Sequence, residues 1–431
     1  MSSLGIISKP LNGTIMAQPS KSMAHRAIIC ASLANGVSNI DNIVLSDDIK
    51  ATLGAVEALG ADIIISKSAK YQGRKSIKIK ARGKINIRNN EIDCMESGTT
   101  ARFIIPITRL NNESVTIKGR GRLVERPFEV YKDLFSDNGI EYHDSNGKMP
   151  IYLAGQLEAG EYTLPGNVSS QFVSGLLFAL PLLNLPSRII ISGKLESLPY
   201  IQMTLQVLEE FGISIEHDSE YKCYNIKPHQ EYKPLENYSV EGDWSQTAFF
   251  CVMGAISGKI TIEGLNTNSL QGDKVILDIL ESMGAKVDFS NKGITFYKSE
   301  LNGTTVDVSQ CPDLVSAIAV AGSVSKGKTS IINGARLRIK ESDRILTTFK
   351  ELRNLGAEIE EQNDGLEIIG KPKLSGGKAY GSEDHRIVMA LASASTVCSN
   401  NVVIEGYNAV SKSYPEFWMD FVALGGEVEY Y

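Results

Sequence analysis

The segment KESDRI at residues 340–345 concentrates groups that serve both acid–base chemistry and anion binding. Lys340, Glu341, Asp343 and Arg344 place four ionisable side chains within five residues. A carboxyl group can move a proton, and lysine or arginine can hold a phosphate or carboxylate. Charge runs are also common on solvated helix faces, where a Glu–Arg pair is worth about 0.2–0.5 kcal/mol. The spacing predicts that Lys340, Glu341 and Arg344 share a helix face, so the segment's place in the chain must separate the two interpretations.

Comparable groups stand at the starts of six predicted helices made of small and apolar residues. They are Lys21, Ser22 and Arg26; Gly98 and Thr99; Ser169, Ser170 and Gln171; Asp243; Asp313; and His385 with Arg386. The first N–H groups of a helix have no partner within the helix and favour anions. The plainer interpretation is that Ser20, Ser169, Asp243 and Asp384 only cap their helices. Lys, Arg, Gln and His are not favoured caps, so their recurrence predicts a site for a multiply anionic small molecule.

These helices belong to a repeat of about 70 residues. In each copy a second helix ends in an apolar residue followed by a glycine and a strand. The glycines are Gly60, Gly139, Gly212, Gly284, Gly356 and Gly425. Glycine suits the left-handed position that follows a helix. Six copies, each mixing two helices with several strands, predict an α/β fold with three copies in each of two domains. The small-residue helices are apolar nearly all round and are predicted to be buried.

The composition narrows the class of protein. A chain of 431 residues with 42% hydrophobic and 22% charged residues predicts a globular protein of two or more domains. Its net charge of −6 argues against nucleic acid as the main partner. The longest apolar stretch, 175–183, is too short to span a bilayer, and no secretory signal is evident, so we expect a cytoplasmic protein without a membrane partner. Six scattered cysteines predict neither a zinc site nor a disulfide framework.

Nine segments in order resemble the enolpyruvyl transferase family, and within it the branch that acts on shikimate-3-phosphate. The segments are SKSMAHRA (20–27), SGTTARF (97–103), ERP (125–127), VSSQF (168–172), SLPY (197–200), PD (312–313), RIKESDRI (338–345), EDHRIVM (383–389) and KSYPEF (412–417). The resemblance covers the whole chain and implies an inverse α/β-barrel fold with two similar domains, each of three βαβαββ units with buried parallel helices. Residues 1–19 with 240–431 would form one domain and residues 20–239 the other. The active site would lie in the cleft between the domains.

The resemblance implies a reaction as well as a fold. The enolpyruvyl group of phosphoenolpyruvate would pass to the 5-hydroxyl of shikimate-3-phosphate through a tetrahedral intermediate, with release of phosphate, as a step of aromatic amino acid biosynthesis. No organic cofactor and no metal are implied, and the two small-molecule substrates would be the partners of a monomer. Asp313 would accept the hydroxyl proton, and Glu341 or Lys21 would protonate the alkene. The division of proton transfers among these three catalytic candidates stays open.

The family motifs also imply two sets of binding residues. Shikimate-3-phosphate would be held by Lys21, Ser22, Arg26, Ser169, Ser170, Gln171, Ser197, Tyr200, Asp313 and Lys340. Phosphoenolpyruvate would be held by Lys21, Gly98, Arg126, Gln171, Arg344, His385, Arg386 and Lys412. A side chain at position 98 would narrow the phosphoenolpyruvate pocket, so the herbicide glyphosate is expected to compete there. The chain departs from the family pattern at Pro19, Glu96 and Arg336, and Arg336 is left out of the site.

Two alternative functions stay open: a different reaction within the same family, and ligand binding without catalysis. The sister enzyme that enolpyruvylates UDP-N-acetylglucosamine shares the fold but uses a cysteine on a mobile loop, and the corresponding segment here, GRGRLVERP at 119–127, has none. A ring-shaped or clamp-like binding protein built from the same repeat would spread its basic residues over an outer face. Here they gather at helix starts beside Asp313 and Glu341. Only an assay excludes phosphate binding without turnover.

Overall fold

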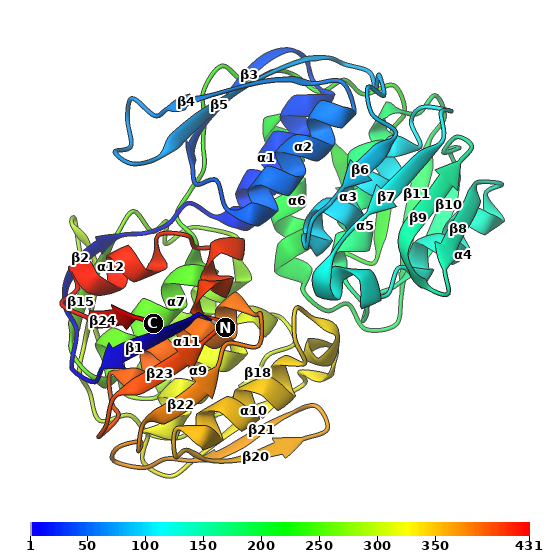
Figure 1. Ribbon diagram of the computed structural model, residues 1–431. Helices are drawn as coiled ribbons and strands as arrows, with labels where there is room; N and C mark the ends of the chain where they lie inside the picture. The colour runs from blue at the N-terminus through cyan, green and yellow to red at the C-terminus, as the bar shows by residue number, and fades with distance from the viewer. Residues whose placement is uncertain (1) are drawn as a thin grey trace. The chain divides into compact units, whose positions relative to one another are not determined.

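A computed structural model describes residues 2–431 of the chain (Figure 1). It divides into two compact units, of which unit 1 comprises Met1–Gln18 with Glu241–Tyr431 and unit 2 comprises Pro19–Val240. The chain leaves unit 1 after Gln18 and returns to it at Glu241. Unit 1 is therefore assembled from both ends of the sequence, whereas unit 2 is continuous.

Unit 2 contains three four-stranded sheets and six α-helices. In sheet order the strands are β14 (Tyr238–Ser239), β3 (Asn35–Ile43), β5 (Lys75–Arg82), β4 (Asp62–Lys67); β6 (Glu91–Asp93), β7 (Val115–Lys118), β9 (Lys148–Ala154), β8 (Glu141–Ser145); and β10 (Glu161–Pro165), β11 (Ser187–Ser192), β13 (Cys223–Ile226), β12 (Ile215–His217). The helices are α1 (Lys21–Leu33), α2 (Asp47–Ala58), α3 (Gly98–Thr108), α4 (Glu129–Asp137), α5 (Ser170–Ala179) and α6 (Leu198–Glu210), with 3₁₀ turns η1 (Gly121–Glu125) and η2 (Leu180–Leu182).

The described part of unit 1 repeats this inventory. Its strands, in sheet order, are β16 (Lys286–Ser290), β17 (Gly293–Tyr297), β15 (Lys259–Glu263), β2 (Asn12–Met16); β18 (Thr305–Asp307), β19 (Lys328–Ile332), β21 (Gly365–Ile369), β20 (Glu358–Gln362); and β22 (Gly377–Tyr380), β23 (Val402–Glu405), β1 (Ser3–Ile7), β24 (Glu427–Tyr430). Its helices are α7 (Trp244–Ile256), α8 (Ile276–Ser282), α9 (Val315–Ser323), α10 (Arg344–Asn354), α11 (His385–Ser395) and α12 (Phe417–Ala423), with 3₁₀ turns η3 (Gly272–Val275), η4 (Pro312–Leu314), η5 (Ala335–Ile339) and η6 (Tyr407–Lys412).

All six sheets found in residues 2–431 have the same pairing. A parallel pair of strands is followed by two antiparallel neighbours, as in β6–β7–β9–β8 and β18–β19–β21–β20. Three sheets are completed by strands from distant parts of the chain. Strand β14 pairs with β3, β2 pairs with β15, and β1 lies between β23 and β24. The mixed α/β prediction is confirmed, and the sheets equal the predicted repeats in number.

The helices predicted to be buried are buried. Every residue of α7, α9 and α11 is shielded from solvent, and these three helices pack against one another inside unit 1 (Figure 1). Helices α9 and α11 are rich in alanine, glycine and serine, and such small residues let helix backbones approach closely. Helices α1, α3 and α5 of unit 2 are also largely buried. Of the helices within residues 2–431, none combines the length and apolarity needed to cross a membrane.

The six repeat glycines all follow helices in the predicted left-handed conformation, with φ between 70° and 107°. A residue with a Cβ would be strained there, because its Cβ crowds the neighbouring carbonyl oxygen. The glycine therefore ends each outer helix and turns the chain into the next strand. This local signal explains why the repeat could be found in the sequence.

Candidate active site

Capping side chains define the starts of the inner helices, as the plainer interpretation predicts. In unit 1 the Asp243 carboxylate accepts a hydrogen bond from the Gln246 backbone N–H at 2.8 Å, and Asp384 accepts one from the Arg386 N–H at 2.9 Å. Ser20 and Ser169 cap α1 and α5 in the same way. Capping thus accounts for these Ser and Asp residues, but it leaves the neighbouring Arg, Gln and His to be explained.

Unit 1 gathers two arginines around one carboxylate at the starts of α9, α10 and α11. The Asp313 carboxylate accepts hydrogen bonds from Arg344 Nη1 at 2.7 Å and from Arg386 Nη2 at 2.9 Å. Arg386 Nη1 also donates to the backbone carbonyl of Ser245 in α7 at 3.2 Å. The three inner helices therefore begin at the same end of unit 1, and the two guanidinium groups are only 3% and 4% exposed.

Arg344 is the centre of this cluster. Besides Asp313, its Nη2 donates to Glu341 at 2.6 Å and its Nε to Asp384 at 2.9 Å. The expected helix face over 340–344 is wrong, because α10 begins at Arg344 with Asp343 as its cap and residues 340–343 lie in the loop before it. The Glu341–Arg344 pair forms all the same. The loop lets Glu341 approach the inner helix starts rather than project from an outer helix.

The electrostatics of the cluster favour charged groups despite burial. Burial opposes ionisation of Asp313, but Arg386, Arg344 and Lys340 together hold its pKa well below the usual value. Arg344 lowers the pKa of Asp384 in the same way, against the effect of burial. Burial lowers the pKa of Lys340 to about 8, although Asp313 and Glu341 attract its ammonium group. An anionic ligand that took over the arginines would therefore change the proton affinity of Asp313.

Two further candidates lie beside the start of α11. His385 is buried, with Nδ1 3.8 Å from the Asp384 carboxylate. The Lys412 ammonium donates to the backbone carbonyl of Glu383 at 2.7 Å. Ser382 and Glu383 both have positive φ, 53° and 52°, a strained conformation for residues with a side chain. Such strain often persists at functional sites, and here it immediately precedes the α11 cap.

Asp273 is a buried carboxyl group of this cluster that the sequence did not single out. Its side chain is 1% exposed and accepts a hydrogen bond from the Ser245 hydroxyl near the start of α7. Burial, together with the nearby Asp313, raises its pKa to about 7, and Arg386 opposes this shift. The segment QGDK at 271–274 gave no signal beyond a loop before a helix.

In unit 2 a buried arginine, Arg26, connects two other predicted residues, Ser22 and Tyr200. Arg26 is 1% exposed and donates to the backbone carbonyls of Ser22 and Tyr200, each at 2.7 Å, and to the Thr204 hydroxyl at 2.8 Å. Ser197 lies immediately before the first residue of α6 and has a positive φ of 56°. Arg26 thereby fixes the start of α6 against α1, so it holds the position of Ser22 and Tyr200.

Lys21, the first residue of α1, pairs with a carboxylate that sequence reasoning missed. Its ammonium group lies 2.6 Å from Asp48 near the start of α2, and both side chains are mostly buried at 15% and 13% exposure. His25, one turn on, contacts the Thr52 hydroxyl at 2.6 Å. Burial, with Lys21 and Arg26 nearby, lowers the pKa of His25 well below its usual value, which fits a neutral packing residue.

A second group in unit 2 joins the starts of α3 and α5. Gln171 donates to the Thr99 hydroxyl at 2.8 Å and accepts from Arg102 Nη1 at 2.9 Å. A Cβ at Gly98 would lie 2.5 Å from Arg126 Nη1 and 3.0 Å from Arg102 Nη1. The absent side chain at position 98 therefore makes room for two guanidinium groups.

The whole chain matches proteins of one kind. The sequence model of the family described as EPSP synthase (3-phosphoshikimate 1-carboxyvinyltransferase) matches residues 6–421. The chain belongs to the EPSP synthase family. A 3-phosphoshikimate 1-carboxyvinyltransferase of Clostridium novyi is 46% identical over 431 residues, covering 100% of this chain and 99% of the relative. Another, of Clostridium kluyveri, is 47% identical over 419 residues, 97% of this chain and 96% of the relative.

A solved structure also shares the fold. The EPSP synthase of Acinetobacter baumannii superposes with a TM-score of 0.80 at 23% sequence identity, and the match covers 100% of both chains. The resemblance inferred from nine short segments is thus confirmed at the level of family and of α/β architecture. This agreement does not extend to the roles of individual residues.

Besides Asp273, three residues that were not among the candidates, Arg102, Asp48 and Asp384, contact predicted site residues in this member of the EPSP synthase family. Arg102 lies one turn beyond Gly98 in the matching segment SGTTARF, which was the available signal. Asp48 and Asp384 were visible only as helix-start acids. Arg336, left out of the site, is buried and donates from Nη2 to the Ser309 carbonyl at 2.5 Å.

Proposed function

We propose that this chain, a member of the EPSP synthase family, uses Asp313 as the base when it transfers the enolpyruvyl group of phosphoenolpyruvate to the 5-hydroxyl of shikimate-3-phosphate, with release of phosphate. Membership of the EPSP synthase family supports the choice of reaction. The observation that carries it is the contact of Asp313 with both Arg344 and Arg386 at the starts of α9, α10 and α11. A potential base and two rigid anion-binding groups are in place together, as a reaction between two anionic substrates requires.

We assign phosphoenolpyruvate to the arginine-rich groups. Its phosphate and carboxylate each suit the two-pronged hydrogen bonding of a guanidinium group, which lysine cannot supply. The proposed residues are Arg344, His385, Arg386 and Lys412 of unit 1, with Lys21, Gly98, Arg126 and Gln171 of unit 2.

We assign shikimate-3-phosphate chiefly to unit 2. Ser169 and Ser170 lie at the start of α5, where the positive end of the helix favours its phosphate. Arg26 would hold neighbouring site residues in position, since its three donor nitrogens already bind Ser22, Tyr200 and Thr204. The full proposed set is Lys21, Ser22, Arg26, Ser169, Ser170, Gln171, Ser197 and Tyr200, with Asp313 and Lys340 of unit 1.

The arginine contacts suggest how Asp313 becomes a base only when it is needed. Both carboxylate oxygens are occupied by guanidinium groups, one by Arg344 and the other by Arg386. Phosphoenolpyruvate would draw these donors onto its own phosphate and carboxylate. Asp313 would then lose the interactions that hold its pKa low, and its proton affinity would rise toward that of a useful base for the 5-hydroxyl.

Glu341 and Lys21 remain the candidates for protonating the phosphoenolpyruvate methylene carbon. Glu341 is bound to Arg344 at 2.6 Å, so that contact must open before Glu341 can carry a proton. The Lys21 ammonium group is bound to Asp48, so it would have to turn from this carboxylate toward the substrate to donate a proton. The proposed chemistry uses no cofactor. Action as a monomer in the cytoplasm, without nucleic acid or membrane partners, completes the proposal.

We also propose that each unit is an inverse α/β-barrel with its helices inside its sheets. Complete burial of α7, α9 and α11, and their mutual packing, support this arrangement in unit 1. The common pairing order of the three sheets in each unit supports a three-fold repeat.

Phosphate release from phosphoenolpyruvate by the purified protein tests the function. We expect release that requires shikimate-3-phosphate and is not supported by UDP-N-acetylglucosamine. Asp313→Ala and Glu341→Gln should each lower kcat by about a hundredfold or more, the usual scale for a lost proton-transfer group. Release with only the sugar nucleotide would move the chain to the sister reaction. No release with either acceptor would leave a phosphate-binding protein without this chemistry.

A further inference from the structure

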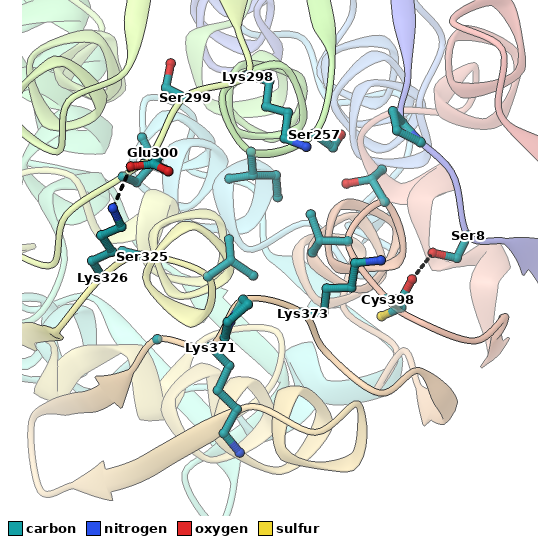
Figure 2. Close-up of a pocket in the computed structure, with 18 of the residues that line it drawn as sticks. Ser8, Ser257, Lys298, Ser299, Glu300, Ser325, Lys326, Lys371, Lys373 and Cys398 are labelled. Carbon is teal, nitrogen blue, oxygen red and sulfur yellow. Dashed lines mark hydrogen bonds and ion pairs between the residues drawn. The ribbon is translucent and has the colours of Figure 1, made fainter.

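A cavity of about 660 Å³ lies at the end of unit 1 where the inner helices finish (Figure 2). Its lining includes Ile256, the last residue of α7, and the segments that follow α9 and α11. The candidate active-site residues stand at the opposite ends of these helices. Helices of this length span about 15 Å, so the cavity is separate from the catalytic cluster.

The cavity is strongly basic in a chain that is acidic as a whole. Five lysines and one glutamate line it, whereas the whole chain carries a net charge of −6. The six residues are Lys9, Lys298, Glu300, Lys326, Lys371 and Lys373. A cluster of positive charges in a concave site favours an anionic ligand, all the more in a chain whose net charge is negative.

Two of these lysines have no carboxylate partner. Three lysines are paired, with Lys9 2.6 Å from Glu427, Lys326 2.5 Å from Glu300 and Lys371 3.6 Å from Glu358. By contrast, Lys298 and Lys373 make no ion pair or side-chain hydrogen bond with any residue in the described range 2–431. In Figure 2 the ammonium group of Lys298 extends toward Ser257 and that of Lys373 toward Ser8, while Lys371 points away from both. The two unpaired ammonium groups are thus available to a ligand in the cavity.

Helix capping does not explain the unpaired lysines. Cations near a helix C-terminus can bind its last carbonyl groups. Here hydroxyl groups already do so: Ser257 donates to Met253 at 2.9 Å, Ser325 to Ala321 at 2.9 Å, and Ser8 to Ser395 at 2.7 Å. These three backbone carbonyls are satisfied without Lys298 and Lys373.

At the corresponding end of unit 2, large side chains are buried against backbone carbonyl groups. There Tyr232 is 3% exposed and donates to the carbonyl of Phe178 near the end of α5 at 2.8 Å. Arg109 is fully buried beyond the end of α3 and donates to two backbone carbonyls at 2.9 Å each. Buried side chains of unit 2 thus occupy positions at this end, whereas lysines line the cavity of unit 1.

We propose that this cavity binds a small organic polyanion, a molecule with at least two phosphate or carboxylate groups, through Lys298 and Lys373. Its volume is in the range of small-molecule sites, about 300–1,000 Å³. Pro10, Ile256, Leu301 and Val324 give the cavity apolar walls for the body of the ligand. Both lysines lie in loops that follow sheet strands, Lys298 after β17 and Lys373 after β21. The proposal is independent of the reaction assigned to the opposite end of the helices.

Titration calorimetry of the full chain at low salt tests this site, with tripolyphosphate as the phosphate probe and citrate as the carboxylate probe. The double variant Lys298→Gln/Lys373→Gln should lose one equivalent of binding, or bind at least about tenfold more weakly. The matched control Lys292→Gln/Lys378→Gln removes the same charge from exposed positions outside the cavity and should change affinity less than twofold. The tighter probe identifies the anionic group that the cavity prefers.

The outcomes separate this site from the proposed active site. Binding to the helix starts would persist in the cavity variant, and phosphate release should be unchanged in both double variants. Absence of binding by both probes would overturn the proposal, as would equal weakening in the cavity and control variants. Thermal unfolding of both variants checks that they fold, which we expect because all four lysines are exposed.

Discussion

Replacing Arg344 by lysine tests whether the three-way guanidinium contact organises the helix starts of unit 1. The substitution keeps a positive charge but presents one nitrogen in place of three. Arg344 binds Asp313, Glu341 and Asp384 through separate nitrogens. A single ammonium nitrogen cannot take the positions of three guanidinium nitrogens, so we expect two of the three charged contacts to be lost.

The burial of each partner sets the size of the effect. Asp313 and Glu341 are 19% and 24% exposed, so water can replace part of what they lose, whereas Asp384 is 0% exposed and cannot recruit water. Charged hydrogen bonds contribute about 1.5–3 kcal/mol each. We therefore expect a loss of about 3 kcal/mol in the unfolding free energy of unit 1. For a domain of this size that lowers Tm by about 6–12 °C.

Scanning calorimetry at pH 7 measures this shift, and Arg353→Lys is the matched control. Arg353 lies on the same helix, α10, but is exposed, so its replacement should cost less than about 0.5 kcal/mol. The KM for phosphoenolpyruvate should rise in Arg344→Lys and not in the control. A shift of about 2 °C is the size expected for a surface change. A Tm for Arg344→Lys within 2 °C of the control would therefore refute the view that the three contacts of the Arg344 guanidinium group hold the cluster together.

Three other predictions address separate groups of the candidate site. Gly98→Ala places a Cβ 2.5 Å from Arg126 Nη1, so steady-state kinetics should show a higher KM for phosphoenolpyruvate and weaker competition by glyphosate; unchanged constants would mean that the pocket does not lie there. Asp273 has its folded pKa raised to about 7 from about 4 when unfolded, so its contribution to stability is lost as pH rises through that interval. The Tm of Asp273→Asn relative to wild type should therefore increase from pH 5 to pH 8, and a constant difference would contradict the shift. Because the pKa of Lys340 is about 8, the KM for shikimate-3-phosphate should rise above pH 8. Lys340→Arg should lack that rise, and an equal rise in both proteins would point to another group.

Much of the fold could be predicted because its signals act within a few residues. Gly139 and Gly356 end their helices through one left-handed residue, and Asp243 and Asp384 begin theirs through one hydrogen bond each. The apolar character of α9 all round its axis required its burial. Each of these effects depends on backbone geometry or solvent exclusion at the position itself, so spacing in the sequence was enough.

The sequence also limited the possible chemistry, but the helix predicted over residues 340–344 is wrong. It identified Lys340, Glu341 and Arg344 as unusual, yet it predicted a shared helix face where the chain forms a loop that ends at Arg344. Side-chain spacing cannot distinguish a helix from a loop that brings the same charges to a common partner. The partner, Asp313, lies 31 residues from Arg344.

The sequence by itself determined the six-fold repeat, the buried helices with their caps and glycine ends, and the residue types available for anion binding. Only the tertiary structure decided which charges meet. Asp313 joins Arg386 across 73 residues, and Lys21 joins Asp48 across 27. It also decided that β1, near the N-terminus, lies between β23 and β24, which are near the C-terminus. Local preferences are set within a helical turn, whereas charge pairing and sheet closure depend on where packing brings distant segments and excludes water.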